Sequence, residues 1–339
     1  MYPIRVLSRE QTENVLDMKT VIADIEKVYL MKFRDAGKLF PMIFHEFEPG
    51  VADMDIKSGL LEDENIFGLK LVSWYGSNAG KGLPLLTGTV MIFDLITGKP
   101  LGLLSAEHLT GMRTGAAGAI GAKHLARKGV QDLLIVGTGH QAAYQAAACL
   151  IALDNIRKVR VYAPTDHAHA VDFTEKIKPQ LKEKFHFKGE ISATFEAVED
   201  IKSAVEKSDV IVTVTPSRKP LILKEWVRKG THISCVGADM SGKQEIDENI
   251  FSGAKIFVDD VSQALNVGES EIPFKKGIIT RDSIIGEIGE LICGDKKGRT
   301  SDDDITIFDS TGIALQDLMT ARSALKAAEE NNIGTVVDL

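Results

Sequence analysis

The feature that most constrains the fold is a short apolar segment that runs directly into a glycine-rich turn. Residues 132–142 read DLLIVGTGHQA. The apolar residues 133–136 have the length and composition of a buried parallel strand. Gly137, Gly139 and Ala142 then follow the G-x-G-x-x-A spacing of a turn that binds a dinucleotide.

Each position of this turn has a physical role. Gly137 permits the tight turn, Gly139 leaves the backbone open to a pyrophosphate, and Ala142 lets the next helix pack closely on the strand. A helix predicted over 141–153 directs its N-terminal N–H groups at the phosphates. A strand predicted over 159–162 completes a β-α-β unit. We expect the other residues of the turn to contact the cofactor as well: Thr138, His140 and Gln141.

From residue 130 onward, strand-like and helix-like segments alternate. Buried strands rich in Val and Ile that alternate with helices predict a doubly wound parallel sheet. The predicted strands are 133–136, 159–162, 190–195, 210–215, 232–236 and 255–258, and the predicted helices are 167–185, 197–206 and 245–252. A strand at 305–308 and a long helix at 313–330 come after them. The polar run 296–304 is interpreted as a solvated loop.

The first part of the chain has a different pattern. Residues 9–36 predict one or two amphipathic helices, and 106–127 predict helices rich in small residues. Strands at 42–44, 67–74, 89–93 and 101–104 predict a small antiparallel sheet. If the last helix returns to this part, the doubly wound domain, 126–312, is inserted into a discontinuous domain of residues 1–125 and 313–339.

Composition excludes several classes of protein. The 339 residues carry a net charge of −8, so no basic excess is present to bind nucleic acid or an anionic membrane. No segment approaches the roughly 20 apolar residues of a membrane span, and residues 1–5 lack the apolar core of a signal peptide. We therefore expect a soluble, cytoplasmic protein. Cys149, Cys235 and Cys293 form no C-x-x-C pair, so no disulfide framework and no metal site is predicted, and the first two are expected to be buried.

Several segments together resemble the ornithine cyclodeaminase/mu-crystallin family. They are 68–73, 82–84, 109–110 with 113–114, 137–142, 237–243 and 309–312 with Gln316 and Asp317, and they occur in the family's order. The resemblance implies a Rossmann domain inserted into a smaller α/β domain that binds substrate and dimerises through its sheet. It also implies hydride transfer between NAD(H) or NADP(H) and the α-carbon of an amino acid or its imine.

The resemblance gives roles to three charged residues. Lys70 and Arg113 supply positive charge for the substrate carboxylate, Arg113 through its planar fork. Lys70 alternatively has the depressed pKa of a group that exchanges protons with the substrate. Asp239, after the strand at 232–236, is the acid/base carboxylate that stabilises the iminium. Spacing alone leaves open a turn residue at Asp239, a surface ion pair at Arg113 and a solvent-facing Lys70.

The cofactor site implied by the resemblance extends along the ends of several predicted strands. Its members are Thr114, Ala163, Thr165, Asp166, Thr215, Val236, Gly237, Asp309, Ser310, Thr311 and Gly312. An Asp directly after the strand at 159–162 would indicate NAD, and a nearby Arg would indicate NADP. Residues 163–166, Ala-Pro-Thr-Asp, fit neither pattern. We lean to NAD because the Arg is absent and Asp166 can reach a ribose, although Thr165 and His167 can bond a phosphate.

The chain departs from the family pattern near the substrate. Met42 follows Pro41 where many members have an Arg or Lys that holds the substrate carboxylate, and residues 54–57 replace a common Met-Pro-Ala segment. Lys57 or His45 can supply the missing positive charge. The departure makes alanine or ornithine a less favoured substrate.

Three functions are compatible with these residues. The first is an amino-acid dehydrogenase or imine reductase, and the second is a cyclodeaminase-type lyase that keeps NAD⁺ bound and releases ammonia. The Asp-Ser-Thr-Gly of 309–312 favours the first. The third is a binding protein without catalysis, which the presence of Lys70, Arg113 and Asp239 argues against. The expected partners are an amino or imino acid and a second copy of the chain.

Overall fold

The computed structural model describes residues 2–338, apart from the side chain of Ala79. It contains two compact units, Met1–Arg113 with Ile313–Leu339 and Thr114–Gly312. Met1 and Leu339, the outer ends of the first predicted domain, lie outside the described residues. The first unit boundary falls inside α3 (Ala106–Leu125), whereas the sequence interpretation placed it at 125/126. The second half of α3 belongs to the second unit and packs closely inside it, where a Cβ at Gly121 would lie 2.3 Å from the Phe308 ring.

The first unit is built on an eight-stranded sheet. Its order is β18-β1-β7-β6-β5-β4-β2, and β3 also pairs with β4. The strands are β1 (Pro3–Leu7), β2 (Gly37–Leu39), β3 (Ile43–Glu48), β4 (Ala52–Leu61), β5 (Ile66–Tyr75), β6 (Leu86–Asp94), β7 (Pro100–Ser105) and β18 (Thr335–Asp338). The pairing of β1 with β7 is parallel and the other pairings are antiparallel, so the predicted antiparallel sheet is larger than expected and mixed.

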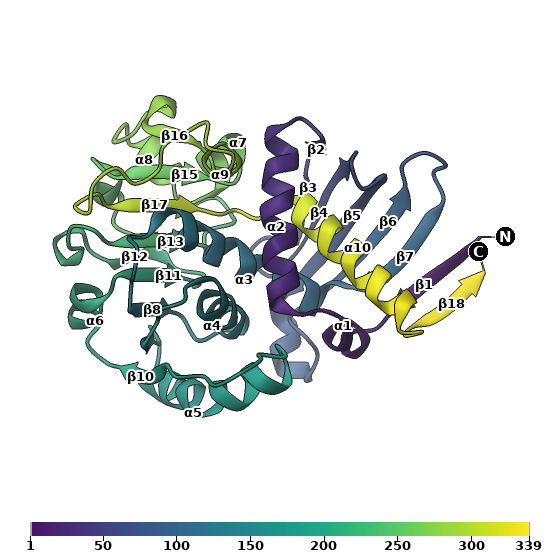
Figure 1. Ribbon diagram of the computed structural model, residues 1–339, viewed down its shortest axis with the longest axis horizontal. Helices are drawn as coiled ribbons and strands as arrows, with labels where there is room; N and C mark the ends of the chain where they lie inside the picture. The colour runs from purple at the N-terminus through teal and green to yellow at the C-terminus, as the bar shows by residue number, and fades with distance from the viewer. Residues whose placement is uncertain (1, 339) are drawn as a thin grey trace. The chain divides into compact units, whose positions relative to one another are not determined.

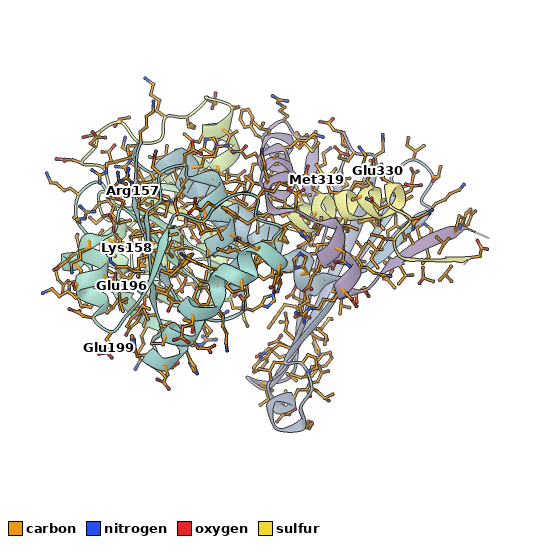
Figure 2. The ribbon with its side chains drawn as sticks, turned by 60° about the horizontal axis from the view of Figure 1, so that its bottom comes forward. Arg157, Lys158, Glu196, Glu199, Met319 and Glu330 are labelled. Carbon is orange, nitrogen blue, oxygen red and sulfur yellow. The ribbon has the colours of Figure 1, made fainter. Side chains whose placement is uncertain are left out.

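Helices cover one face of this sheet. The predicted helical region 9–36 forms α1 (Arg9–Val15) and α2 (Met18–Phe33), separated where Asp17 accepts the Thr20 N–H at 3.0 Å and caps α2. The long C-terminal helix is α10 (Ala314–Glu330), and η1 (Gly76–Lys81) is a short 3-10 turn. Figure 1 shows α2 and α10 on the same side of the strands, and Figure 2 labels Met319 and Glu330 along α10. Close packing requires glycine beneath α10, since a Cβ at Gly59 would lie 2.9 Å from the Leu315 side chain.

The second unit is the predicted doubly wound parallel sheet. Its order is β10-β9-β8-β11-β13-β17-β15-β16, and every pairing within it is parallel. The strands are β8 (Asp132–Val136), β9 (Lys158–Tyr162), β10 (Thr194–Val198), β11 (Val210–Thr213), β13 (His232–Cys235), β15 (Lys255–Val258), β16 (Ile284–Glu287) and β17 (Thr306–Asp309). The helices are α4 (His140–Ala152), α5 (His167–Glu183), α6 (Ile201–Lys207), α7 (Val261–Val267), α8 (Glu271–Lys275) and α9 (Ile288–Ile292).

Three sequence predictions in this unit are wrong in type or position. The strand predicted at 190–195 lies later, at β10, and the helix predicted at 197–206 begins only after its Asp200 cap. The helix predicted at 245–252 is replaced by β14 (Gln244–Ile246), which pairs with β12 (Arg218–Ile222), and by the 3-10 turn η3 (Glu248–Phe251). Pairing with a strand distant in sequence therefore overrides the local helical pattern.

The remaining short elements and the cysteines complete the description. The other 3-10 turns are η2 (Lys224–Trp226) and η4 (Arg281–Ser283). The run 296–304 is irregular, as predicted, but it is also tied to the unit, since Arg299 Nε donates to the Leu125 carbonyl at 2.9 Å. Cys149 and Cys235 are buried, which confirms the expectation for both. Within residues 2–338, no helix is long and apolar enough to cross a membrane, and no cluster of His, Cys, Asp or Glu is arranged to hold a metal ion.

Candidate active site

The glycine-rich turn has the geometry that the sequence predicts for its first position. Gly137 has φ +117°, and a Cβ there would lie 2.9 Å from the Val214 carbonyl oxygen, so a larger residue is both strained and crowded. Gly139 differs, because a Cβ there would meet no atom within 4 Å. Gly139 is also the N-cap of α4, with no side-chain cap bond. The open space and the uncapped helix start fit an approaching phosphate.

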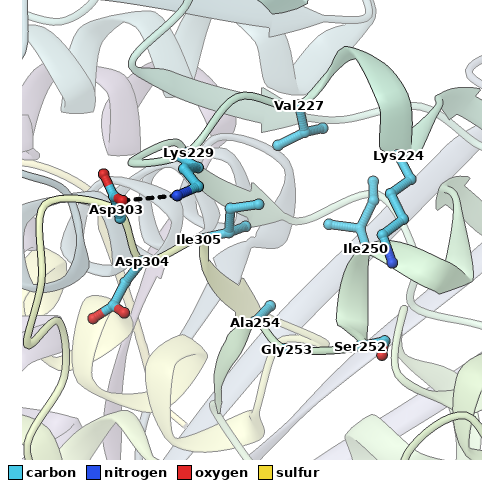
Figure 3. Close-up of a pocket in the computed structure, with 10 residues that line it drawn as sticks. All are labelled: Lys224, Val227, Lys229, Ile250, Ser252, Gly253, Ala254, Asp303, Asp304 and Ile305. Atoms are coloured by element: carbon cyan, nitrogen blue, oxygen red, sulfur yellow. Dashed lines mark hydrogen bonds and ion pairs between the residues drawn. The ribbon is translucent and has the colours of Figure 1, made fainter.

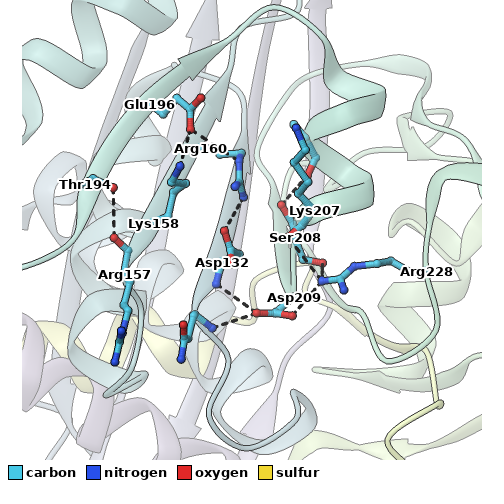
Figure 4. Close-up of polar contacts among 12 residues, drawn as sticks. Asp132, Arg157, Lys158, Arg160, Thr194, Glu196, Lys207, Ser208, Asp209 and Arg228 are labelled. Atoms are coloured by element: carbon cyan, nitrogen blue, oxygen red, sulfur yellow. Dashed lines mark hydrogen bonds and ion pairs between the residues drawn. The ribbon is translucent and has the colours of Figure 1, made fainter.

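The residues after β9 are arranged around the start of α5. Ala163 is buried, and Thr165 and Asp166 are exposed. One Asp166 carboxylate oxygen accepts the Ala168 N–H at 2.9 Å and so caps α5. Arg160 points away from this region, because its guanidinium bonds Asp132 at 2.7 Å (Figure 4). Arg160 therefore does not take the place of the arginine that would bind a phosphate after β9.

The segment 309–312 uses its polar groups within the fold. Asp309 is fully buried and accepts the N–H groups of Glu269 and Ser270 at 3.1 and 2.8 Å. The hydroxyls of Ser310 and Thr311 and the Gly312 N–H donate to Asp259. That these four residues contact the cofactor remains a prediction. The side chains of Asp309, Ser310 and Thr311 already form hydrogen bonds with protein groups.

Thr215 and Gly237 meet at one buried carboxylate that the sequence interpretation did not single out. Glu245 Oε1 accepts the Thr215 N–H at 2.5 Å, and Oε2 accepts the Gly237 N–H at 2.9 Å. Val236, just before Gly237, is also buried, and the Thr114 carbonyl accepts a bond from Gln145 at 2.9 Å. No motif marks Glu245, because the residues it binds lie eight and thirty positions away.

Three charged side chains from separate elements meet inside the first unit. Lys70 on β5 lies 3.0 Å from a carboxylate oxygen of Asp317 on α10, and Arg113 Nε on α3 lies 2.9 Å from the other oxygen. All three are at most 5% exposed. We call Lys70, Arg113 and Asp317 the cation cluster. Asp317 belongs to a segment noted in the sequence, but its pairing with both cations was not predicted.

Neighbouring side chains fix the orientation of the cation cluster. Arg113 Nη1 donates to the Gln316 side-chain oxygen at 3.0 Å, and Gln316 in turn donates to the Tyr29 hydroxyl at 2.7 Å. Lys57 on β4 stands directly opposite Lys70 on β5, so both project from the same face. The structure therefore brings Lys57 to the cation cluster.

Met42 and His45 lie elsewhere. Met42 is 44% exposed, and His45 pairs with Met54, which is three residues from Lys57 and so faces the other side of the sheet. The structure does not bring His45 to the cluster. The alternative in which His45 replaces the missing cation is thus not supported by its position.

Burial and like charge shape the electrostatics of the cation cluster. Burial, followed by the neighbouring Arg113, lowers the pKa of Lys70 to about 8, although Asp317 opposes this shift. Burial acts to raise the pKa of Asp317, but Arg113 and Lys70 hold it below its ordinary value. Two buried cations thus share one ionised carboxylate at neutral pH. The excess positive charge can hold the carboxylate of a ligand.

Asp239 lies on a loop after β13 in the second unit. Its side chain is half exposed and forms an ion pair with Lys243 four residues later. Its loop is bonded to a second buried acid, Glu271, through the Ser241 hydroxyl and the Gly242 N–H. An exposed carboxylate on a fixed loop is suited to exchange protons with a ligand.

A separate pocket of about 270 Å³ lies at the opposite edge of the parallel sheet. Ala254 and Ile305 in its wall precede β15 and β17, so it opens at the amino ends of these strands. Figure 3 shows Lys229 paired with Asp303 at its rim, at 2.9 Å. None of the predicted site residues lines this pocket, and ligands of open α/β sheets bind at the other, carboxyl edge.

A parallel sheet of Rossmann type with an open glycine turn at the carboxyl end of β8 is the architecture of dinucleotide-dependent enzymes. The chain belongs to the ornithine cyclodeaminase/mu-crystallin family, whose model matches residues 5–332. The resemblance found in the sequence motifs is thereby confirmed.

Similar proteins share nearly the whole chain. Alanine dehydrogenase of Archaeoglobus fulgidus is 36% identical over 332 residues, which cover 98% of this chain and 97% of that protein. The structure of Thermococcus litoralis Delta(1)-pyrroline-2-carboxylate reductase with NADH and L-proline has a TM-score of 0.91 at 33% identity, covering 98% of this chain and 100% of that one. An archaeal alanine dehydrogenase dimer with bound NAD has a TM-score of 0.90 at 35% identity, with 100% of both chains covered.

Proposed function

We propose that this chain is an NAD-dependent oxidoreductase that reduces a 2-imino acid to the amino acid and runs the reverse oxidation at the same site. The observation that carries the proposal is the cation cluster, in which two buried cations share one carboxylate. The relatives act in this class, as alanine dehydrogenase and as a cyclic-imine reductase. Two of the similar structures hold NAD or NADH.

The cation cluster binds the substrate carboxylate in this proposal. Arg113 uses Nε for Asp317 and Nη1 for Gln316, which leaves Nη2 for a ligand oxygen. Lys70 and Lys57 add positive charge from the same face of the sheet. Asp317 keeps both buried cations charged and oriented, because its own charge offsets part of theirs.

The second unit supplies the cofactor site and a proton. The open Gly139 position and the uncapped start of α4 receive the pyrophosphate, and the reduced nicotinamide supplies the hydride when bound. Asp239 stabilises the iminium and moves the proton at its carboxylate oxygen. We favour NAD over NADP for two reasons. Arg160 is paired with Asp132, so it does not bind a 2′-phosphate. One Asp166 oxygen accepts the Ala168 N–H, and the other can accept a hydrogen bond from a ribose hydroxyl.

We also propose that the chain forms a homodimer through the face of the first unit's sheet that lies opposite α10. Ile43, Ile56 and Leu71 form an aligned row across β3, β4 and β5 on that face. Ile43 is 54% exposed and Leu71 is 38% exposed. Exposed apolar rows of this kind mark interaction surfaces, and a similar protein is a dimer.

The three cysteines of this chain are free thiols. We propose a cytoplasmic location, because thiols stay reduced there.

The test is a spectroscopic assay of cofactor oxidation. Purified protein with NADH or NADPH is given 2-oxo acids with ammonia or methylamine, cyclic imino acids, and ornithine. We expect NADH to be consumed with at least one imine and faster than NADPH. Ammonia release from ornithine with catalytic NAD⁺ and no net change in cofactor would instead establish the lyase.

A further inference from the structure

Glu245 joins the carboxyl ends of two neighbouring strands of the parallel sheet. It lies on β14, is fully buried, and faces the ends of β11 and β13. Its Oε1 accepts the N–H and hydroxyl of Thr215 at 2.5 and 2.7 Å, and its Oε2 accepts the Thr213 hydroxyl at 2.7 Å and the Gly237 N–H at 2.9 Å. Each carboxylate oxygen therefore serves one backbone N–H and one hydroxyl.

The contact between Glu245 and the turn at Gly237 leaves no spare room. A Cβ at position 237 would lie 2.4 Å from the Thr215 carbonyl oxygen and 2.5 Å from Glu245 Oε2. Since Gly237 starts the loop that carries Asp239, the position of this carboxylate sets where the loop leaves the sheet.

A second buried acid holds the far end of the same loop. Glu271, at the start of α8, is 1% exposed. One of its oxygens accepts the Gly242 N–H at 2.7 Å, and the other accepts the Ser241 hydroxyl. The loop 237–242 is thus bonded to a carboxylate at both ends, and Asp239 stands between them.

We propose that Glu245 and Glu271 are positioning residues for the reaction. Glu245 fixes Thr215 and Gly237 at the cofactor site and sets the root of the Asp239 loop, and Glu271 fixes the loop's far end. The effect on Asp239 rests on the proposed function.

The effect of Glu245 is on cofactor binding, which can be measured without any substrate.

Only a carboxylate satisfies the groups around Glu245. A glutamine there has one oxygen and one NH₂, and whichever way its amide turns, the NH₂ meets a backbone N–H of Thr215 or Gly237. One backbone donor then loses its partner, and the turn must move. The same substitution has a different effect at the neighbouring Glu269.

Glu269 provides a matched control. It is also 1% exposed, and its Oε1 accepts the N–H groups of Glu245 and Ile246, each at 2.8 Å. Its Oε2 has no hydrogen-bond partner among the described residues. Glu269→Gln can keep the accepting oxygen and place its NH₂ at the other position. This variant changes a buried glutamate of the same region without touching Thr215 or Gly237.

The first experiment measures the affinity of the whole protein for NADH by fluorescence titration at about pH 7.5. We expect Glu245→Gln to weaken NADH binding about tenfold, and Glu269→Gln to leave it within about twofold. Melting curves report the folded fraction, so affinity is compared for folded protein alone. Equal affinities in the two variants, or no NADH binding by the unaltered chain, would overturn the assignment of Glu245.

The second experiment is a double-mutant cycle that does not depend on the folding of Glu245→Gln. It compares kcat for Glu271→Ala, Asp239→Asn and the two combined. We expect Glu271→Ala to lower kcat about tenfold with NADH affinity kept, and to add little once Asp239 is changed. Losses that multiply would show that Glu271 acts independently of Asp239 and would overturn its part of the proposal.

The outcomes also separate this inference from the proposed function. Selective loss of NADH binding in Glu245→Gln, with no imine reduced by any form, supports the role of Glu245 and rejects the imine reductase. Imine reduction with equal NADH affinities in Glu245→Gln and Glu269→Gln supports the proposed function and rejects the role of Glu245.

Discussion

The two units each bury a group of charges, but they neutralise them in different ways. In the first unit, the cation cluster is balanced by one carboxylate, Asp317, within ion-pair distance of both cations. In the second unit, the buried acids Glu245, Glu269 and Asp309 accept bonds from N–H and hydroxyl donors, and none of the ion pairs among the described residues includes them. We call these three acids the carboxylate cluster.

In our proposal, the difference separates a group of charges that binds a ligand from a group of charges that holds the backbone in place. In the cation cluster, two cations share one anion, and positive charge is left for a ligand. In the carboxylate cluster, burial raises the pKa of Glu245 and of Asp309 to about 7 each, and that of Glu269 well above its ordinary value. The cluster relieves its excess charge by keeping a proton at Glu269, whose Oε2 has no hydrogen-bond partner among the described residues, and Glu245 still accepts four hydrogen bonds. Buried charge alone therefore does not identify a ligand site; the sign and size of the uncompensated charge do.

Removal of Asp317 tests the comparison most severely. In Asp317→Asn, the buried Lys70 and Arg113 lose their counter-charge, so we expect the free energy of unfolding to fall by about 3–5 kcal/mol. Chemical denaturation measures this change. Asp303→Asn removes the exposed partner of Lys229 and should cost less than about 1 kcal/mol. Equal losses in the two variants would show that the cation cluster does not depend on Asp317.

The role of the cluster in binding is tested at Arg113. In Arg113→Lys the planar fork is lost while the charge stays, so we expect the KM for the imino acid to rise about 10- to 100-fold. The KM for NADH should change less than about threefold, because the cofactor is held by the other unit in our proposal. Steady-state kinetics with both substrates checks this. A rise confined to NADH would place the carboxylate site elsewhere.

The proton equilibrium of Lys70 predicts how binding depends on pH. Since its pKa is lowered to about 8, Lys70 is cationic below that pH and neutral above it. The KM for the imino acid should therefore rise by about tenfold as the pH passes from 7 to 9. Lys70→Arg stays charged over this range and should remove the inflection near pH 8. An unchanged inflection in that variant would assign it to another group.

The smallest expected effect concerns stability in the carboxylate cluster. A carboxyl whose folded-state pKa is raised contributes stability that is complete below its unfolded-state pKa and is lost as the pH rises through its folded-state pKa. Glu269→Gln removes this loss because an amide does not ionise, so we expect about 1 kcal/mol of stabilisation at pH 8 and less at pH 5. Urea unfolding of both proteins at the two pH values measures the difference. Destabilisation at pH 8 would contradict the raised pKa.

Local features of the chain were predictable and long-range ones were not. The turn at Gly137 and Gly139 was predicted because its geometry depends on adjacent residues. The ion pair between Arg113 and Asp317 was not predicted, because 204 positions separate the two residues. Lys57 was predicted only as one of two alternatives, because the register of β4 against β5 decides whether it faces Lys70. The same limit explains why β14 was taken for a helix: its partner, β12, lies more than twenty residues earlier.

The divided first unit has a consequence for the order in which the protein is synthesised. Ribosomes build a chain from its N-terminus, and domains generally fold as units during synthesis. The second unit, continuous from residue 114 to residue 312, is complete before α10 emerges. Lys70 and Arg113 precede the second unit, yet Asp317 is made 204 positions after Arg113. A nascent chain can therefore complete its nucleotide sheet while the cation cluster is still unassembled, and premature termination before α10 would yield a polypeptide without that cluster.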